Sequence, residues 1–168
     1  MAERTRTWRR TLLHVGGALL AVFVAMQLIP YGWTHSNPPV SADAPWPSAE
    51  AEAIARESCY SCHSNETDWP AYSYVAPASW LVRRDVDEGR SKLNFSTWGQ
   101  GDDDADEAAE EVEEGAMPPS KYTLMHPGAK LTDEEARILV DALEAMTGDR
   151  GDDHSGSGRG GDDEGYDD

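Results

Sequence analysis

The feature that most constrains this chain is Cys59-Tyr60-Ser61-Cys62-His63, a C-x-x-C-H sequence. The chain has 2 cysteines and both lie in this motif, so no thiol is left for a wider disulfide framework. Two thiols three residues apart on one helical turn can reach the two vinyl groups of a single porphyrin, and the residue that follows can present its imidazole to iron. The motif therefore predicts haem c, attached through Cys59 and Cys62 and ligated by His63.

Two other interpretations of the cysteine pair stay open at this point. A redox-active disulfide is one, although such motifs usually lie in a βαβ context and no strand alternation is apparent here. Half of a zinc site is the other, and its remaining ligands would have to include a residue such as His126, because there is no second cysteine pair.

An apolar run near the amino terminus indicates export, which favours haem attachment. Residues 11–29 would span roughly 28 Å as a helix, close to the thickness of a hydrocarbon core. Residues 1–10 form a basic flank that contains one acidic residue, Glu3, and four arginines, Arg4, Arg6, Arg9 and Arg10. This pattern predicts a single-pass signal anchor in the cytoplasmic membrane, with a cytoplasmic amino terminus and the rest in the periplasm or outside the cell. A cleaved signal peptide, ending at Val40-Ser41-Ala42, is the alternative.

The remainder divides into a spacer, a domain and a tail. Residues 30–47 are rich in proline and predict an extended spacer. Residues 48–147 hold four helical patterns and no strand pattern, which predicts an all-α domain. Residues 148–168 are rich in glycine and aspartate and predict a disordered acidic tail.

The helices of the domain are predicted from their end signals. Ser48 caps a helix that continues through the C-x-x-C-H motif to His63. A second helix runs from Pro77 to Gly89 and a third, very acidic one from Asp102 to Glu114. The last begins at a Thr132/Glu135 capping box and ends at Gly148. Its apolar stripe is Ala136, Leu139, Val140, Leu143 and Met146.

Aromatic residues are expected to form much of the core and to line the porphyrin, because the chain has 2 phenylalanines. The residues concerned are Trp69, Tyr72, Tyr74, Trp80, Phe95, Trp98 and Tyr122. Arginines and acids also alternate between Arg83 and Arg90. A solvated charged helix face is the simple interpretation of that alternation. The sharper one is an arginine that holds a haem propionate.

Met117 is the predicted sixth ligand of the iron. It precedes Pro118, and a residue before proline is excluded from helical backbone, so the thioether is held on an extended loop. Thioether ligation raises the reduction potential relative to a second histidine. Met125 and His126 are the fallback ligands, and His126 is equally well explained as a structural residue.

Charge limits the partners. The formal net charge is -18, with 32 acidic and 14 basic residues. We expect no nucleic-acid partner, because phosphate contacts need a basic surface. A redox partner with a basic docking patch is expected, since opposite charge steers encounter.

Several stretches of the sequence resemble a known family. The stretches CYSCHSNETDWPAYSYVAPASWLVRRDVDEGRSKLNFSTW and GAMPPSKYTLMHPGAKLTDEEARIL, with SNPPV before them, resemble the bacterial haem-binding domain family of single-haem, membrane-tethered cytochrome c-like proteins. The resemblance covers roughly residues 30 to 146. It implies a small helical cytochrome c-like fold, haem c on Cys59, Cys62 and His63, and a Met-Pro step at Met117.

Three functions follow from these observations. Electron transfer is the first expectation, with both axial sites of the iron filled. A haem-based redox or gas sensor, or small-ligand binder, is the alternative and needs an open sixth site. A peroxidase is not expected, because one C-x-x-C-H motif is present and no distal acid–base pair is apparent beyond His126.

Overall fold

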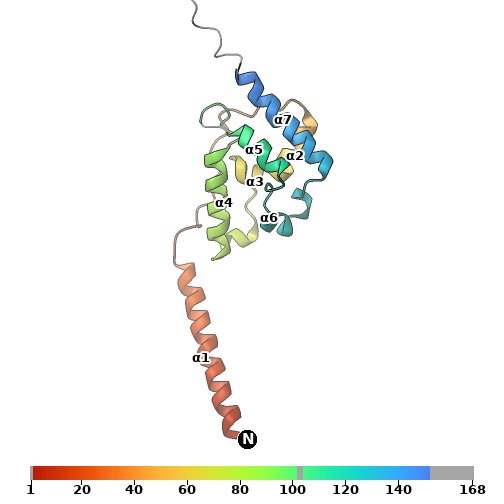
Figure 1. Cartoon of the computed structure of the whole chain (residues 1–168). Coiled ribbons are helices and arrows are strands. Elements are labelled where there is room, and N and C mark those ends of the chain that lie inside the picture. The colour runs from red at the N-terminus through yellow and green to blue at the C-terminus, as the bar shows by residue number, and fades with distance from the viewer. Residues whose placement is uncertain (1, 102–103, 152–168) are drawn as a thin grey trace, which may run out of the picture. The chain divides into compact units, whose positions relative to one another are not determined.

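The computed structural model describes residues 2–101 and 104–151. This part of the chain is helical (Figure 1). The α-helices are α1 (Ala2–Gln27), α2 (Ala49–Ser58), α3 (Tyr60–His63), α4 (Ala78–Lys92), α5 (Ala105–Glu113), α6 (Ser120–Met125) and α7 (Asp133–Gly151). Two 3-10 helices are η1 (Ala71–Tyr74) and η2 (Pro127–Ala129). The β interaction in the described ranges is one isolated parallel bridge between Ala42 and Thr97, so the predicted all-α class is confirmed.

The chain forms two compact units. The first contains residues 2–43 and 60–101, and therefore α1, α3, η1 and α4. The second contains residues 44–59 and 104–151, and therefore α2, α5, α6, η2 and α7. Each unit is described by itself.

The second unit is built on α7, which packs against α5 and α2. The side chains of Leu139, Leu143 and Met146 are buried on α7, which confirms the core of the predicted stripe. Opposite them, α2 and α5 bury mostly alanine, at Ala51, Ala55, Ala105 and Ala109. Of the seven aromatic residues expected to form much of the core, Tyr122 lies in this unit and is half-buried, whereas the buried faces of α2 and α5 are rich in alanine.

The predicted helix caps of this unit are present. The Ser48 side chain accepts a hydrogen bond from the Ala51 backbone N–H at 3.1 Å, and α2 follows. At the start of α7, the Glu135 N–H donates to Thr132 Oγ1 at 3.3 Å, and the Thr132 N–H donates to Glu135 Oε2 at 2.8 Å. These reciprocal bonds are those of a capping box, and they lower the pKa of Glu135.

Helix boundaries differ from the sequence expectation at glycines. α4 continues past Gly89 to Lys92, and α7 continues past Gly148 to Gly151. A glycine ends a helix when it adopts a left-handed conformation, and neither of these does so. The predicted acidic tail comprises residues 148–168, and its residues 152–168 lie outside the part of the chain that the structure describes.

The first unit begins with α1, which holds a stretch able to cross a membrane. Trp8–Gln27 has a mean hydropathy of 1.4 and none of it is buried within the structure. Its length and composition agree with the predicted single membrane span. After α1, α4 packs against α3 and η1, and the side chain of Phe95 is 2% exposed. The Phe95 ring stacks on Tyr60 at 5.3 Å and on Trp98 at 6.2 Å between centroids.

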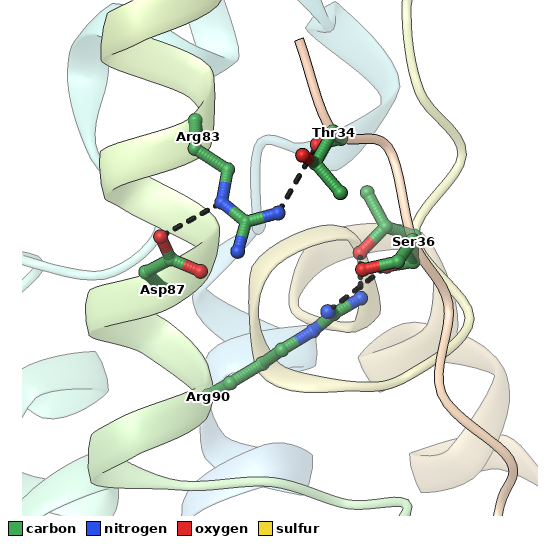
Figure 2. Close-up of polar contacts among 6 residues, drawn as sticks. Thr34, Ser36, Arg83, Asp87 and Arg90 are labelled. Carbon is green, nitrogen blue, oxygen red and sulfur yellow. Dashed lines mark hydrogen bonds and ion pairs between the residues drawn. The ribbon is translucent and has the colours of Figure 1, made fainter. Parts of the chain in front are cut away.

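The proline-rich segment after α1 is extended, but it is bound along the first unit. Figure 2 shows the guanidinium groups of Arg83 and Arg90 reaching from α4 to the backbone of this segment. Arg83 donates to the Thr34 carbonyl at 3.1 Å, and Arg90 donates to the Ser36 carbonyl at 3.2 Å. Further along, the Ala42 N–H donates to the Ser96 carbonyl at 3.2 Å. The segment is therefore part of the folded unit up to Ala42.

Arg90 connects this segment with the residues that follow the C-x-x-C-H motif. Besides Ser36, its guanidinium donates to the Ser64 carbonyl at 2.7 Å, to Thr67 Oγ1 at 3.0 Å and to Asn37 Oδ1 at 3.1 Å. Burial lowers the pKa of Arg90, and these acceptors offset the cost of that burial.

Arg90→Ala is expected to lower the free energy of unfolding by about 2–4 kcal/mol, because hydrogen bonds from a charged donor contribute about 1.5–3 kcal/mol each and their acceptors are left unpaired. Arg56 is the matched control, since its ion pair with Glu52 is exposed. Arg56→Ala should change stability by at most about 0.5 kcal/mol. Denaturant unfolding of the full chain in detergent measures both, and equal effects would contradict the role given to Arg90.

Candidate functional site

The C-x-x-C-H motif is split between two helices. Cys59 is the C-cap residue of α2, with φ -118° and ψ -38°, and α3 then begins at Tyr60. The predicted continuous helix from residue 49 to 63 is therefore wrong at Cys59. The break follows from packing, because Tyr60 is buried against Phe95 in the first unit whereas α2 packs against α7 in the second. Both cysteines are half-buried, and no disulfide joins them.

The turn of α3 is held by side chains that follow it in the sequence. Ser64 Oγ donates to the Tyr60 carbonyl at 2.7 Å, and Thr67 Oγ1 donates to the Ser61 carbonyl at 2.9 Å. The Asn65 N–H donates to Ser96 Oγ at 3.0 Å. Ser64, Asn65, Thr67 and Ser96 are all buried. A buried and satisfied polar network of this kind fixes one conformation, so the backbone that carries Cys62 and His63 is rigid.

A backbone hydrogen bond fixes the ring of His63. Its Nδ1 lies 3.2 Å from the Leu93 carbonyl oxygen. A carbonyl can only accept, so Nδ1 carries the proton and Nε2 keeps its lone pair. Burial lowers the pKa of His63, while backbone contacts with Leu93 and Gly89 act in the opposite direction. The imidazole is therefore neutral at pH 7, and Nε2 is available to a metal.

Gly89 lets α4 lie directly against the motif. A Cβ at this position would be 2.7 Å from the Cys62 carbonyl oxygen and 3.0 Å from its carbonyl carbon. Real Cβ atoms essentially never approach backbone so closely. The absence of a side chain at Gly89 therefore sets the distance between α4 and Cys62.

The donor groups of the C-x-x-C-H motif are of the kind that a haem needs. Two cysteines that no disulfide joins and an imidazole with a fixed Nδ1–H are the chemical groups that covalent haem attachment and iron ligation need. In addition, Trp80 Nε1 is buried and has no hydrogen-bond partner among the described residues. A buried N–H without a partner is costly, and a cofactor carboxylate is an acceptor of the kind that it lacks.

The predicted sixth ligand and its fallbacks lie in the second unit. Met117 is half-buried in the loop between α5 and α6, and its N–H donates to the Glu111 carbonyl at 3.0 Å. Met125 is 60% exposed at the end of α6. The His126 ring stacks on Tyr122 at 4.4 Å between centroids. Ligation by Met117 stays a prediction, as do the ligand roles of Cys59, Cys62 and His63.

Sequence reasoning missed the residues that orient the motif from outside it. Leu93 acts through its carbonyl, and Gly89 acts through the absence of a side chain. Arg83 and Arg84 form pairs one turn apart with Asp87 and Glu88, as a solvated charged face predicts. Arg83 also donates to the Thr34 carbonyl, and the guanidinium of Arg90 donates to four residues of the chain, so the chain itself uses both groups.

Comparison with known proteins agrees with this chemistry. A model of the haem-binding domain family matches residues 21–145. Over 127 residues the chain is 30% identical to the cytochrome c peroxidase Ccp of Escherichia coli strain K12. That match covers 66% of this chain and 27% of the peroxidase, so the chain spans about a quarter of its relative's length. No solved structure matches the chain. Because the family match covers most of the sequence, the chain belongs to the haem-binding domain family, and its cofactor is haem.

Proposed function

We propose that this chain is a mono-haem c-type cytochrome that transfers electrons on the outer face of the cytoplasmic membrane. The observation that carries the proposal is the geometry of His63, whose Nδ1–H is committed to the Leu93 carbonyl directly after the Cys59/Cys62 pair. Cys59 and Cys62 would hold the porphyrin through thioether bonds, and His63 would ligate the iron through Nε2. When bound, haem c supplies an iron that changes between the ferric and ferrous states.

We further propose that α1 is retained as a membrane anchor. Cleavage after Ala42 would remove Ser36 and Asn37, which accept two of the hydrogen bonds from Arg90. The Ala42 carbonyl accepts a hydrogen bond from the Trp98 N–H at 3.0 Å, and cleavage after Ala42 would remove this contact as well. A segment with such contacts supports an uncleaved chain. Export of the domain across the membrane follows from the basic residues before α1.

The absorption spectrum of the ferric protein tests the proposal. The full chain is made in a host with the c-type maturation machinery. A low-spin spectrum with the weak long-wavelength methionine-to-iron band is the expected result. A high-spin spectrum, or carbon monoxide binding to the reduced protein at ordinary rates, would instead favour the sensor function. A chain without haem would overturn the proposal.

Met117→Ala is expected to abolish the methionine-to-iron band and to lower the reduction potential, because a thioether stabilises ferrous iron. Met125→Ala is the matched control, since Met125 is exposed. It should leave both the spectrum and the potential unchanged. If Met117→Ala changes neither quantity and His126→Ala changes both, the sixth ligand is His126.

Peroxide reduction is the second candidate function, and the match to a cytochrome c peroxidase is what favours it. The measurement is the rate of peroxide turnover by the holoprotein, compared with that of a haem peptide containing the same C-x-x-C-H motif. We propose electron transfer without peroxide turnover, and so expect no excess over the peptide. A rate well above that of the peptide would make the chain a peroxidase.

A redox partner with a basic docking patch is proposed from the net charge of -18. Attraction between exposed charges is screened within about 10 Å at 0.1 M ionic strength. The rate of electron exchange with a basic soluble cytochrome should therefore fall steeply as salt is added. Stopped-flow measurement at increasing ionic strength checks this, and a rate that does not fall would argue against electrostatic steering.

A further inference from the structure

Large apolar side chains are exposed where α1 ends, and they come from two separate stretches of sequence. Leu28, Tyr31 and Trp33 follow α1, and their exposures are 72%, 48% and 61%. Tyr74, Val75 and Leu81 come from η1 and the first turn of α4, with exposures of 63%, 44% and 59%. These six residues are called the exit patch. An exposed apolar cluster of this kind usually marks an interaction surface.

Hydrogen bonds fix the two halves of the exit patch to each other. At the last residue of α1, Gln27 Nε2 donates to the Ala76 carbonyl at 3.1 Å, and the Ala76 N–H donates to Gln27 Oε1 at 3.0 Å. Two reciprocal bonds define both position and orientation. The end of α1 is therefore attached directly to the loop that carries Tyr74 and Val75.

Three further contacts extend this attachment. Gly32, with φ +87°, lies so close to Ser79 that a Cβ would be 2.8 Å from the Ser79 carbonyl oxygen. The His35 ring stacks on Tyr74 at 4.0 Å, and His35 Nε2 lies 2.9 Å from the Ser73 carbonyl oxygen. The exit patch is thus one surface beside the end of α1.

The charge around the exit patch is unlike that of the rest of the chain. The sequence contains 32 acidic residues, yet none occurs from Arg4 to Ala42 or from Trp69 to Arg84. Acidic side chains are repelled by the anionic headgroups of a bacterial membrane, and arginines are attracted to them. Arg83 and Arg84 close the second of these acid-free stretches. The surface next to the membrane helix is therefore the one that an anionic bilayer tolerates.

We propose that the exit patch is seated in the headgroup layer of the bilayer that α1 crosses. Tryptophan and tyrosine concentrate at this depth, because their rings are apolar and their N–H and O–H groups remain hydrated. The exposed Arg84 guanidinium pairs with Glu88 at 2.7 Å, and a lipid phosphate can compete with that carboxylate for it. The inference rests on the proposed anchoring by α1 and adds that the first unit lies on the membrane surface, at a fixed height, and does not swing on a flexible spacer.

Photo-crosslinking in the full-length holoprotein tests this docking. p-Benzoylphenylalanine replaces Tyr74 or Leu81, which are distant from α1 in sequence. It replaces Leu124 in the control, because Leu124 is 79% exposed on α6. Each protein is reconstituted in vesicles of phosphatidylethanolamine and phosphatidylglycerol, irradiated, and analysed for lipid adducts by mass spectrometry. Adducts at positions 74 and 81 are expected at several times the yield at position 124.

Two outcomes separate this inference from the anchoring on which it rests. If alkaline carbonate releases the chain from membranes, the anchoring and the docking both fail. If the chain resists carbonate but lipid adducts at 74 and 81 are no more frequent than at 124, the docking alone is overturned. Two positions are used so that disturbance of the His35–Tyr74 stack cannot decide the result, since Leu81 lies outside that stack.

Discussion

In the double variant Cys59→Ala/Cys62→Ala, we expect acidified organic solvent to extract all of the haem from the chain. The two cysteines are half-buried, Cys59 as the C-cap residue of α2 and Cys62 within the one-turn helix α3, and no disulfide joins them. Thioether bonds are the attachment that survives denaturation, whereas coordination by His63 does not. The measurement is haem staining after denaturing electrophoresis, together with the alkaline pyridine spectrum, which separates thioether-linked haem from haem with intact vinyl groups.

Ser61→Ala is the matched control for the cysteine pair. Ser61 lies between the two cysteines, and the hydrogen bond from Thr67 goes to its backbone carbonyl, which alanine retains. Full covalent attachment is expected in this variant. Each single cysteine variant should keep one thioether and give a pyridine spectrum between the two extremes. Haem that stays on the double variant after extraction would show that another residue attaches it.

Local signals were sufficient for much of the fold. Ser48 and the Thr132/Glu135 pair marked helix starts because a capping bond joins residues three apart in sequence. The stripe that includes Leu139 and Leu143 could be read because its 3.6-residue period reflects one buried face. The cofactor could be predicted for the same reason, since the whole attachment motif lies within five residues.

The remaining features depend on contacts between residues distant in sequence. The carbonyl that orients His63 belongs to Leu93, and backbone groups carry no sequence signature. Arg90 looks like a surface arginine in the sequence, and the paths of residues 36, 37, 64 and 67 make it a half-buried hydrogen-bonding junction. Tyr74 was expected in the core and is exposed, because its ring covers His35 on the outer surface of the first unit.

Gly89→Ala is expected to destabilise the protein, although alanine is the better helix former. At an unconstrained helical site this change stabilises by up to about 1 kcal/mol. At Gly89 the added Cβ would be 2.7 Å from the Cys62 carbonyl oxygen and 3.1 Å from the Cys62 Cβ. Backbone cannot rotate out of the way as a side chain can, so α3 or α4 must shift. Overpacking of this kind costs about 1–3 kcal/mol, which outweighs the gain in propensity.

The displacement should also affect the cofactor site, because the atoms in the way belong to Cys62 itself. We expect Gly89→Ala to lower both the unfolding midpoint and the fraction of chains with covalent haem, and Gly89→Val to lower them further. Gly16→Ala is the control, since nothing lies within 4 Å of its added Cβ, and it should change neither quantity. If Gly89→Ala instead raises the midpoint and leaves attachment complete, α4 does not pack on the motif as the structure has it. A loss that grows with side-chain size at position 89 would show that the approach of α4 to Cys62 positions the thiol for attachment.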